Sequence, residues 1–262
     1  MTFTLATWNI NSVRLREGLV VRLMTEHQPD ILCLQECKSP VDLIPVTQFR
    51  ALGYTHMVAR GQKGYNGVAI ISKLPLVDLG ERDFASLGHA RHVSAKLENG
   101  VTIHNCYVPA GGDIPDRSLN AKFGQKLDFL TEMRDHFHET PPERAILVGD
   151  LNIAPREDDV WSHKQLLKIV SHTPIEVAHF HDVMQAGGWV DVTRKDLPQG
   201  LLYSWWSYRS AEWDIADKGR RLDHIWATPD IINASHSSSI LRPTRGWEQT
   251  SDHVPVFATF DL

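Results

Sequence analysis

The sequence predicts a mixed α/β fold in which at least part of the β-structure is antiparallel. Apolar runs of strand length recur along the whole chain, and helical patterns lie between some of them. The runs Val93–Leu97 and Val101–Val108 flank Glu98-Asn99-Gly100, and Asn-Gly between two strands is a strong hairpin signal. A purely parallel sheet contains no hairpin, so we expect both helices and antiparallel strands.

The other strand-like segments are short and rich in Val, Ile and Leu. In chain order they are Phe3–Trp8, Ile31–Gln35, Val68–Ser72, Ala145–Val148, Leu222–Ala227 and Val254–Phe260. Apolar residues three or four positions apart predict helices over Arg14–Glu26, Leu119–Phe137 and Glu176–Ala186. Two stretches are expected to be irregular, the Pro- and Gly-rich Pro109–Pro115 and the Trp- and charge-rich Thr193–Arg220.

The size and composition of the chain are those of a globular protein with a substantial core. It has 262 residues, of which 42% are hydrophobic, which suits one large domain or two small ones. The net charge is −5 and the pI is about 6.3, unlike a basic protein that coats nucleic acid. An acidic active site could nevertheless mask a local basic surface.

Cysteine usage and the absence of targeting signals predict the compartment. The three cysteines, Cys33, Cys37 and Cys106, include no Cys-x-x-Cys pair for zinc or redox chemistry, which favours a reducing compartment. The chain shows no signal peptide and no run long enough to span a membrane. We therefore expect a cytoplasmic protein without membrane contact, and nothing in the sequence demands more than a monomer.

Four short acidic motifs are the most informative feature of the chain. They are Leu34-Gln35-Glu36, Gly149-Asp150-Leu151-Asn152, Arg221-Leu222-Asp223-His224 and Ser251-Asp252-His253-Val254-Pro255. Carboxylates repel one another, so gathering several in one place needs a cation or a shared proton. Acids and a histidine at strand ends indicate a hydrolytic site built around a hard metal ion. Because the motifs span residues 36–253, no cut in the chain leaves a complete site, and residues 1–262 are expected to form a single domain.

Two of these motifs follow buried strands and have both functional and ordinary interpretations. Glu36 is predicted to bind Mg²⁺ directly, although a charged residue after a strand can simply mark the surface. Gly149 would let the backbone turn sharply or let substrate approach closely. Asp150 could then take a proton from water, and Asn152 could bond a phosphate oxygen, whereas the ordinary role of Asp-x-Asn is to cap a turn.

His253 precedes the last strand, and its partner must come from elsewhere in the chain. Asp252 is adjacent in sequence, but neighbouring residues on a strand point apart, so Asp223 is the candidate orienting acid. Such a pair fixes the tautomer and favours a protonated imidazole. The amide of Asn9 could bind a metal, orient a carboxylate or donate to a phosphate, and the phenol of Tyr107 could reach a phosphate. Their ordinary roles are turn former and core residue.

Aromatic and basic residues lie near these motifs. The segment Tyr203–Tyr208 could hold a flipped or abasic nucleotide if its rings are exposed, although most such rings are core or loop anchors. Several basic residues, each most often a solvated charge, could contact DNA phosphates. They are Arg14, Arg16, Arg60, Lys63, Arg91, Arg156, Lys218, Arg220 and Arg221.

Taken together, these segments resemble the exonuclease III family of DNA-repair nucleases. Eight strings occur in the family's order and cover nearly the whole chain. They are Trp8-Asn9-Ile10-Asn11, Leu34-Gln35-Glu36-Cys37-Lys38, Gly64-Tyr65-Asn66-Gly67-Val68, Tyr107-Val108-Pro109, Gly149-Asp150-Leu151-Asn152, Tyr203-Ser204-Trp205-Trp206, Arg221-Leu222-Asp223 and Ser251-Asp252-His253-Val254-Pro255.

The resemblance implies a four-layer sandwich, in which two mixed, mainly antiparallel β-sheets pack face to face and are flanked by helices. It also implies Mg²⁺ or Mn²⁺ as cofactor and double-stranded DNA with abasic sites or blocked 3′ ends as substrate. The implied reactions are incision 5′ to an abasic site, 3′→5′ exonuclease cleavage and trimming of 3′ ends. Incision would leave a 3′-hydroxyl and a 5′ deoxyribose phosphate.

The family's functional residues fall on matching positions of this chain. Those implied to be catalytic are Tyr107, Asp150, Asn152, Asp223 and His253. Those implied to bind or surround the metal are Asn9, Glu36, Asp150, Asn152, Asp252 and His253. Those implied to contact DNA are Asn66, Arg91, Trp205, Arg220 and Leu222, with Trp205 and Leu222 matching the abasic-sugar pocket.

Two departures from the family pattern and two alternatives bear on this interpretation. Cys37 stands where many relatives have Thr, and Arg220 stands where some have a bulky aromatic beside the pocket, which affects the balance among activities. One alternative is a phosphohydrolase of the same fold that acts on RNA tails, inositol phosphates or lipid phosphodiesters. The other is a non-catalytic DNA-binding or scaffold protein, against which the retention of every expected acid and of His253 argues.

Overall fold

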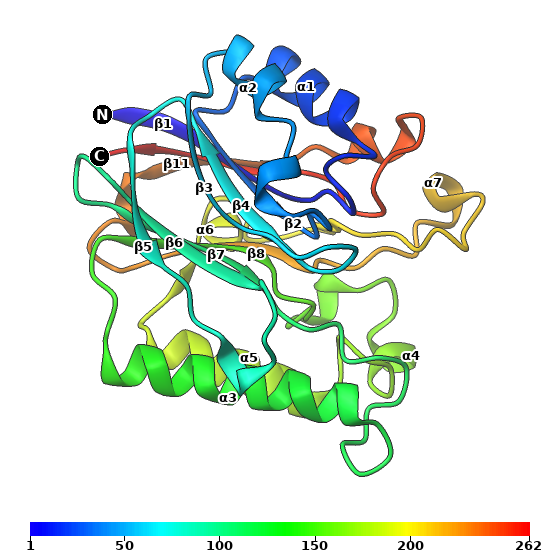
Figure 1. Ribbon diagram of the computed structural model, residues 1–262. Helices are drawn as coiled ribbons and strands as arrows, with labels where there is room; N and C mark the ends of the chain where they lie inside the picture. Colours follow the sequence, from blue (N-terminus) through cyan, green and yellow to red (C-terminus); the bar gives the residue numbers. More distant parts are fainter.

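Two six-stranded β-sheets lie face to face, and helices cover the outer face of each sheet (Figure 1). This computed structural model describes residues 1–262. In each sheet one strand pair is parallel and the other four pairs are antiparallel. The expected four-layer sandwich of two mixed, mainly antiparallel sheets is therefore confirmed.

The first sheet is built from the two ends of the chain and the second from its middle. The first sheet has the order β11-β12-β1-β2-β4-β3 and consists of Thr2–Asn9 (β1), Ile31–Gln35 (β2), His56–Arg60 (β3), Val68–Ser72 (β4), Ser235–Ile240 (β11) and Val256–Asp261 (β12). The second has the order β5-β6-β7-β8-β10-β9 and consists of Leu76–Gly80 (β5), His92–Leu97 (β6), Thr102–Tyr107 (β7), Ala145–Asp150 (β8), Val190–Asp191 (β9) and Asp223–Ala227 (β10). The predicted hairpin is the antiparallel pair β6–β7.

Helices form the two outer layers. Glu17–Glu26 (α1) and Val46–Ala51 (α2) cover the first sheet, and Ala121–Glu139 (α3) and Pro174–Ala186 (α5) cover the second (Figure 1). Shorter helices lie in the connections, namely His163–Leu166 (α4), Val192–Asp196 (α6) and Trp213–Ala216 (α7). Single 3₁₀ turns occur at Val41–Leu43, Phe84–Ser86, Glu157–Asp159, Ile232–Ala234 and Arg242–Gly246. None of the helices combines the length and the apolar composition that a membrane span requires.

Three apolar cores lie between the four layers of the sandwich. The largest fills the space between the sheets, and the other two separate each sheet from its helices. Along β1, Phe3 and Leu5 face the central core, whereas Ala6 and Trp8 face the helix layer. Because the central strands are buried on both faces, they appear in the sequence as continuous apolar runs rather than as alternating patterns.

Three predicted helix starts differ from the observed ones, and at two of them a side-chain cap marks the observed start. The helix predicted from Leu119 begins at Ala121, since the side chain of Asn120 accepts a hydrogen bond from the backbone N–H of Lys122. The helix predicted from Glu176 begins at Pro174, since Thr173 and Glu176 form a capping box. The helix predicted from Arg14 begins at Glu17.

The strands that were not predicted are the four edge strands, β3, β5, β9 and β11. An edge strand is only partly buried, so it lacks the apolar run that marks a central strand. The strand β11, for example, contains Ser-His-Ser-Ser-Ser and is largely exposed. The stretch Thr193–Arg220, predicted to be irregular, contains α7 and most of α6, so that prediction was wrong in part.

Candidate active site

The candidate active site lies where the central strands of both sheets end. In the first sheet β1 and β2 are parallel, with Asn9 opposite Gln35, so Glu36 follows directly at the same edge. In the second sheet β7 and β8 are parallel, with Tyr107 opposite Asp150. Parallel strands bring their carboxyl ends to one edge, and the facing sheets bring the two edges together. Each pair joins segments that are far apart in the chain.

Antiparallel neighbours complete the site with two further side chains. Asp223 begins β10 opposite Asp150 in β8. His253 precedes β12, whose residue Val256 lies opposite Thr7 in β1, so the histidine lies beside the end of β1. The strand connectivity thus places all the carboxylates of the site and its one histidine together.

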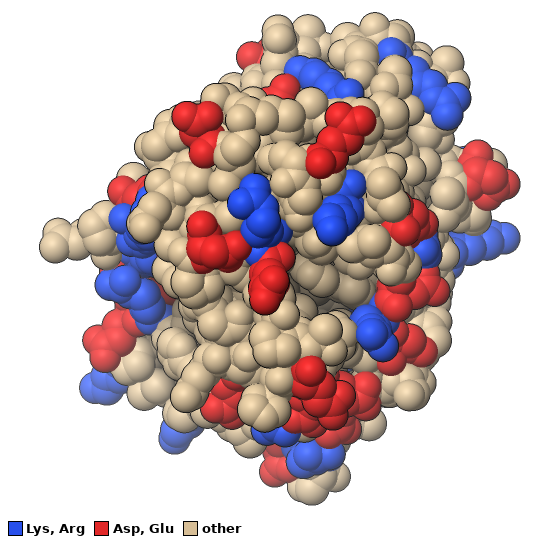
Figure 2. Space-filling view, turned by 90° about the vertical axis from the view of Figure 1, so that its left-hand side faces the viewer, with Lys and Arg blue, Asp and Glu red and all other residues tan.

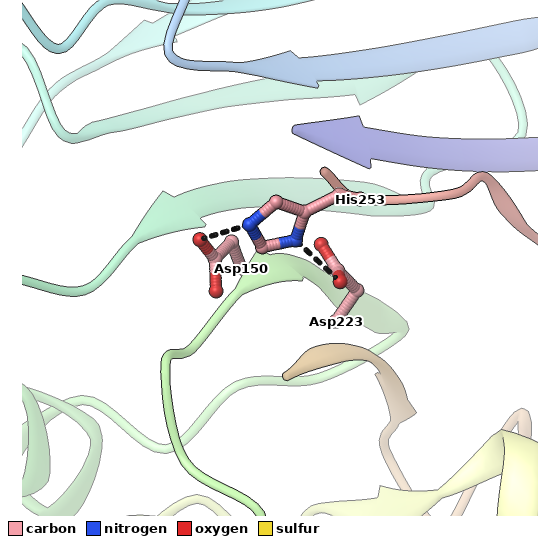
Figure 3. Close-up of side chains that lie close together, drawn as sticks. All are labelled: Asp150, Asp223 and His253. Atoms are coloured by element: carbon pink, nitrogen blue, oxygen red, sulfur yellow. Dashed lines mark hydrogen bonds and ion pairs between the residues drawn. The ribbon is translucent and has the colours of Figure 1, made fainter. Parts of the chain in front are cut away.

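The imidazole of His253 lies between two carboxylates (Figure 3). Its Nδ1 is 2.8 Å from Oδ2 of Asp223, and its Nε2 is 3.7 Å from Oδ2 of Asp150. All three side chains are almost completely buried. The prediction that Asp223, rather than Asp252, orients His253 agrees with this geometry.

Burial and mutual charge shift the pKa values of this group. Burial alone would lower the pKa of His253, but the negative charges of Asp223 and Asp150 outweigh it and raise that pKa. Burial and the charge of Asp223 raise the pKa of Asp150, although the imidazolium opposes the shift. The protonated histidine therefore carries a proton on each ring nitrogen, and Asp150 is a carboxylate with unusual proton affinity.

Glu36 is joined to Asp150 through Asn9. The side-chain amino group of Asn9 lies 2.9 Å from Oδ2 of Asp150 and 3.3 Å from Oε1 of Glu36. The side-chain oxygen of Asn9 accepts from the N–H of Asn11 at 3.1 Å. Asn9 therefore acts here as a donor that links two carboxylates, and this arrangement favours that role over direct metal binding.

Glu36 has two further partners that hold its charge. The phenol of Tyr107 donates to its Oε1, and Nζ of Lys38 lies 2.8 Å from its Oε2. Burial alone would raise the pKa of Glu36, but these bonds and the charge of Lys38 lower it. Burial and the charge of Glu36 raise the pKa of Tyr107 well above its ordinary value, so the phenol keeps its proton.

Asn152 supports Asp150 from the other side. Its backbone N–H and its side-chain amino group donate to the two oxygens of Asp150, at 3.0 and 3.1 Å. The amino group also donates to the carbonyl of Val108 at 2.9 Å. The side-chain oxygen of Asn152 has no donor within the protein and remains available to a ligand.

Strained backbone is concentrated at the strand ends that form the site. Six non-glycine residues with positive φ lie there, namely Asn11, Ser12, Glu36, Lys38, Asn66 and Asn152. Such conformations cost on the order of 1–3 kcal/mol each and persist where surrounding contacts enforce them. The N–H of Ser12 donates to the carbonyl of Glu36, for example, at 2.7 Å.

An open cavity of about 760 Å³ lies in front of these groups, and the predicted site residues line it, lie behind its surface or lie outside it. Its lining includes Glu36, Tyr107, Asp150, Asn152, Trp205, Arg220, Leu222, Asp252 and His253. Asn9 and Asp223 lie behind this surface as partners of lining residues. Asn66 and Arg91 lie outside the lining. Asn66 donates to Gln62, and Arg91 stacks on the ring of Tyr107 at 4.5 Å, so both have structural partners.

The residues assigned to the abasic-sugar pocket form one wall of the cavity. Trp205 forms single β-bridges with Arg220 and with His253, and the guanidinium of Arg220 lies 5.1 Å from the ring of Trp205. Nη1 of Arg220 donates to the hydroxyl of Ser171 at 2.8 Å. Asp252 accepts from Trp205 Nε1 at 2.9 Å, so its expected association with a metal stays a prediction.

Sequence reasoning did not select several residues that shape the site. Lys38 pairs with Glu36, and Asn11 donates to Asp252 at 3.3 Å, although both lie within motifs that were quoted. Lys126 and Glu176 form a buried ion pair behind the cavity. A signal existed for Lys126, because it lies three positions after Phe123 on the apolar face of α3.

The donor set suits a hard cation. Mg²⁺ and Mn²⁺ prefer oxygen ligands, and Mg²⁺ usually takes one or two carboxylates together with waters and substrate phosphate. Glu36 and Asp150 line the cavity, and the free side-chain oxygen of Asn152 lies beside Asp150. Both ring nitrogens of His253 face carboxylates, so its metal-ligating role is not favoured in this arrangement. Carboxylates able to hold a cation beside an imidazolium are typical of metal-dependent hydrolases.

Comparisons with known proteins narrow this class. The sequence model of the Endonuclease/Exonuclease/phosphatase family matches residues 6–253. Exodeoxyribonuclease III of Haemophilus influenzae is 29% identical over 97% of this chain and 98% of its own length. An AP endonuclease from Archaeoglobus fulgidus superposes with a TM-score of 0.92 and 33% identity, over 99% of this chain and 100% of its own. The 3′ phosphatase NExo from Neisseria, solved with a product DNA hairpin, superposes with a TM-score of 0.91 and 31% identity, also over 99% of this chain and 100% of its own.

The chain belongs to the endonuclease/exonuclease/phosphatase family. Its similarity to these relatives shows that it is a nuclease of the DNA-repair type, as the eight motifs predicted. Enzymes of the exonuclease III group are metal-dependent, which agrees with the donor set.

Proposed function

We propose that this enzyme cleaves phosphodiesters of double-stranded DNA with Mg²⁺ or Mn²⁺, incising 5′ to abasic sites and trimming 3′ ends. The observation that carries the proposal is the position of His253, held between Asp223 and Asp150 at the wall of an open cavity that also contains Glu36. The catalytic and metal-binding roles of the individual residues belong to this proposal.

The metal would be held by Glu36, with Asp150 and Asn152 as further oxygen donors. Oε2 of Glu36 is paired only with Lys38, a flexible side chain that can move aside. When bound, the metal supplies Lewis-acid stabilisation of charge on the scissile phosphate. Asn9 keeps Glu36 and Asp150 close together although both are negatively charged.

The side chains divide the proton transfers between them. Asp150, whose pKa is raised, accepts a proton from the attacking water. His253 presents its Nε2–H to a phosphate oxygen as negative charge builds there, while Asp223 holds its Nδ1–H. The amino group of Asn152 donates to Asp150 and Val108, so it would bond another phosphate oxygen by giving up one of these two hydrogen bonds. The phenol of Tyr107, which keeps its proton, assists the leaving 3′ oxygen.

The cavity wall is proposed to receive the abasic sugar. Trp205 and Leu222 supply apolar surface, and Arg220 closes the wall where some relatives have an aromatic ring. Lys218 and Arg209 also line the cavity and provide positive charge for DNA phosphates. We further expect the enzyme to act as a monomer in the cytoplasm, where its three free cysteines would stay reduced.

The direct test uses a labelled duplex with a single abasic site, incubated with and without Mg²⁺, with identification of the product ends. We expect cleavage only with the metal and products that carry a 3′-hydroxyl and a 5′ deoxyribose phosphate. A recessed 3′ end, a 3′-phosphate and an inositol phosphate, each tested in parallel, would rank the activities. Turnover of the inositol phosphate without cleavage of DNA would reject the proposal.

The substitutions Asp150→Asn and His253→Asn test the assigned chemistry. Each is expected to lower turnover at least ~100-fold, the scale of general acid–base catalysis. Asp135→Asn, at an exposed carboxylate of α3, is the control and should leave turnover unchanged. Near-normal rates for either site variant would contradict the roles given to these residues.

A further inference from the structure

A buried ion pair outside the catalytic group joins three segments that line the cavity. Lys126 in α3 and Glu176 in α5 are both fully buried, and Nζ of the lysine contacts Oε1 of the glutamate. Neither residue lines the cavity. Burying two charges is costly, and such a pair persists only with good geometry and additional hydrogen bonds.

The lysine uses its remaining donors on two lining segments. Its Nζ lies 2.8 Å from the carbonyl oxygen of Asn152 and 3.4 Å from that of Ala110. Asn152 and Ala110 both line the cavity. An ammonium group has three donors, so the contacts with Glu176, Asn152 and Ala110 account for all of them.

The glutamate extends the network to a third lining segment. Both of its carboxylate oxygens accept from the backbone N–H of Ser171 at 2.9 Å, and one accepts from the N–H of Thr173 at 3.2 Å. Ser171 lines the cavity, and its hydroxyl accepts from Arg220. One ion pair therefore braces the segments at Ala110, Asn152 and Ser171.

The contact with Asn152 is the one that reaches the catalytic group. Asn152 has a left-handed backbone, with φ of 55°, and it donates to both oxygens of Asp150. The carbonyl that Lys126 binds belongs to this same residue, so the lysine anchors the backbone of Asn152 on the side of its Cα opposite the donating N–H.

The next two carbonyls of this segment are also held by buried side chains. Nε2 of His224 lies 2.8 Å from the carbonyl of Ile153, and Nδ1 of His172 lies 2.6 Å from that of Ala154. Three successive carbonyls are thus bound by side chains from α3, from β10 and from the segment before α5. Ordinary turns leave such carbonyls to solvent, so this segment is unusually constrained.

We propose that Lys126, neutralised by Glu176, is a positioning residue that holds Asn152 and through it Asp150 in the reactive geometry. The inference rests on the proposed nuclease function and adds to it a residue that touches neither substrate nor metal. Its loss should lower kcat rather than weaken substrate binding, because Trp205, Lys218 and Arg209 of the cavity wall are not part of the network and Arg220 meets it only through Ser171.

The test uses the double variant Lys126→Met/Glu176→Gln, because Lys126→Met alone leaves a buried carboxylate unpaired and can prevent folding. Circular dichroism confirms folding, and steady-state kinetics are measured on the abasic duplex with saturating Mg²⁺. We expect kcat to fall about 10- to 100-fold with KM within about threefold of wild type, the scale of a small misplacement of catalytic groups. Hydrogen exchange of the peptide that covers residues 150–155 should accelerate.

The control is Phe137→Leu, a substitution at the far end of the same helix that disturbs packing against Trp189 without touching the network. It should lower the unfolding temperature but leave kcat and the exchange of residues 150–155 unchanged. A folded double variant with wild-type kcat would overturn the inference. If the wild-type enzyme cleaved no DNA, the proposed function would fail, whereas unchanged exchange in the double variant would independently reject the positioning role.

Discussion

At the scale of single residues, the two flanking carboxylates determine the protonation state of His253. An imidazolium buried without partners would lose its proton, since desolvation disfavours the charged form. Asp223 and Asp150 reverse this effect and raise the pKa of His253. The histidine is thus prepared to donate from Nε2 while Asp223 fixes the ring through Nδ1.

The substitution Asp223→Asn tests this dependence. It keeps an oxygen that can accept from Nδ1 but removes the negative charge, so the protonated form of His253 should be less favoured. We expect kcat on an abasic duplex to fall at least ~100-fold, comparable with the loss of a general acid–base group. A kcat within about threefold of wild type would show that the orienting charge is dispensable.

At the scale of secondary-structure elements, the spacing of β7 and β8 depends on one glycine. Gly149 has a φ of 141°, and a Cβ built there would lie 1.8 Å from the carbonyl oxygen of Cys106 in β7. No side chain fits without separating the two strands. Asp150 follows directly, so the close approach of β7 and β8 also sets the distance between Asp150 and Tyr107.

Gly149→Ala is therefore expected to reduce both stability and activity. The backbone must shift to relieve the clash, which lowers the unfolding temperature and moves Asp150. The matched control is Gly18→Ala in α1, where a Cβ meets nothing within 4 Å. The control should stabilise slightly, by up to about 1 kcal/mol, because alanine is the better helix former. Equal thermal stability of the two variants would contradict this explanation.

A second element-scale feature is the carboxylate of Asp159, which ties the connections around β10 together. Arg221 binds both of its oxygens, at 2.8 and 3.0 Å, and Arg194 of α6 contacts it as well. Burial alone would raise the pKa of Asp159, but the two guanidinium groups outweigh it and lower that pKa to about 2.

This pKa predicts acid sensitivity of the fold. Because the folded pKa lies below the unfolded value, the stabilisation is complete above about pH 4 and is lost as the pH falls towards 2. The contribution is on the order of 2 kcal/mol. Urea unfolding between pH 2 and pH 7 should therefore show a smaller loss on acidification for Asp159→Asn than for wild type. Identical acid dependence would refute the assignment.

At the scale of the whole molecule, the net charge is −5, so acidic residues outnumber basic ones. The face that carries the chain ends, opposite the strand ends of the active site, shows Lys and Arg interspersed with Asp and Glu (Figure 2). With a net charge of −5, the protein has no general attraction for DNA. Arg209, Lys218 and Arg220 line the cavity and can pair with DNA phosphates, so the affinity for DNA should fall with rising salt.

Removal of the metal is expected to abolish activity without unfolding the protein. The three cores consist of apolar side chains and include none of the acidic site residues, so chelation should leave the unfolding temperature nearly unchanged. EDTA should abolish cleavage of an abasic duplex, and added Mg²⁺ or Mn²⁺ should restore it. Glu36→Gln should need more metal for half-maximal activity. Cleavage that survives EDTA would exclude the metal-dependent mechanism.

The central strands and long helices could be predicted from the sequence, whereas the sheet edges could not. Strands such as β2 and β4 are buried on both faces, so each is an unbroken apolar run with the observed bounds. The edge strands β5 and β11 bury little surface and are defined by pairing with a neighbour. Pairing partners leave no local pattern.

The sequence by itself determined which residues are candidates for the chemistry, since Glu36 and Asp150 follow apolar runs and Asp223 lies at the start of one. Only the tertiary structure decided how they interact, as when Asn9 reaches Asp150 across 141 positions of the chain. In the folded protein Asn9 is a hydrogen-bond donor, and both ring nitrogens of His253 face carboxylates. Lys126 binds the carbonyl of Asn152 from behind the cavity. The reason is physical: hydrophobic periodicity is a local property, whereas hydrogen-bond partners are chosen by strand pairing between distant segments.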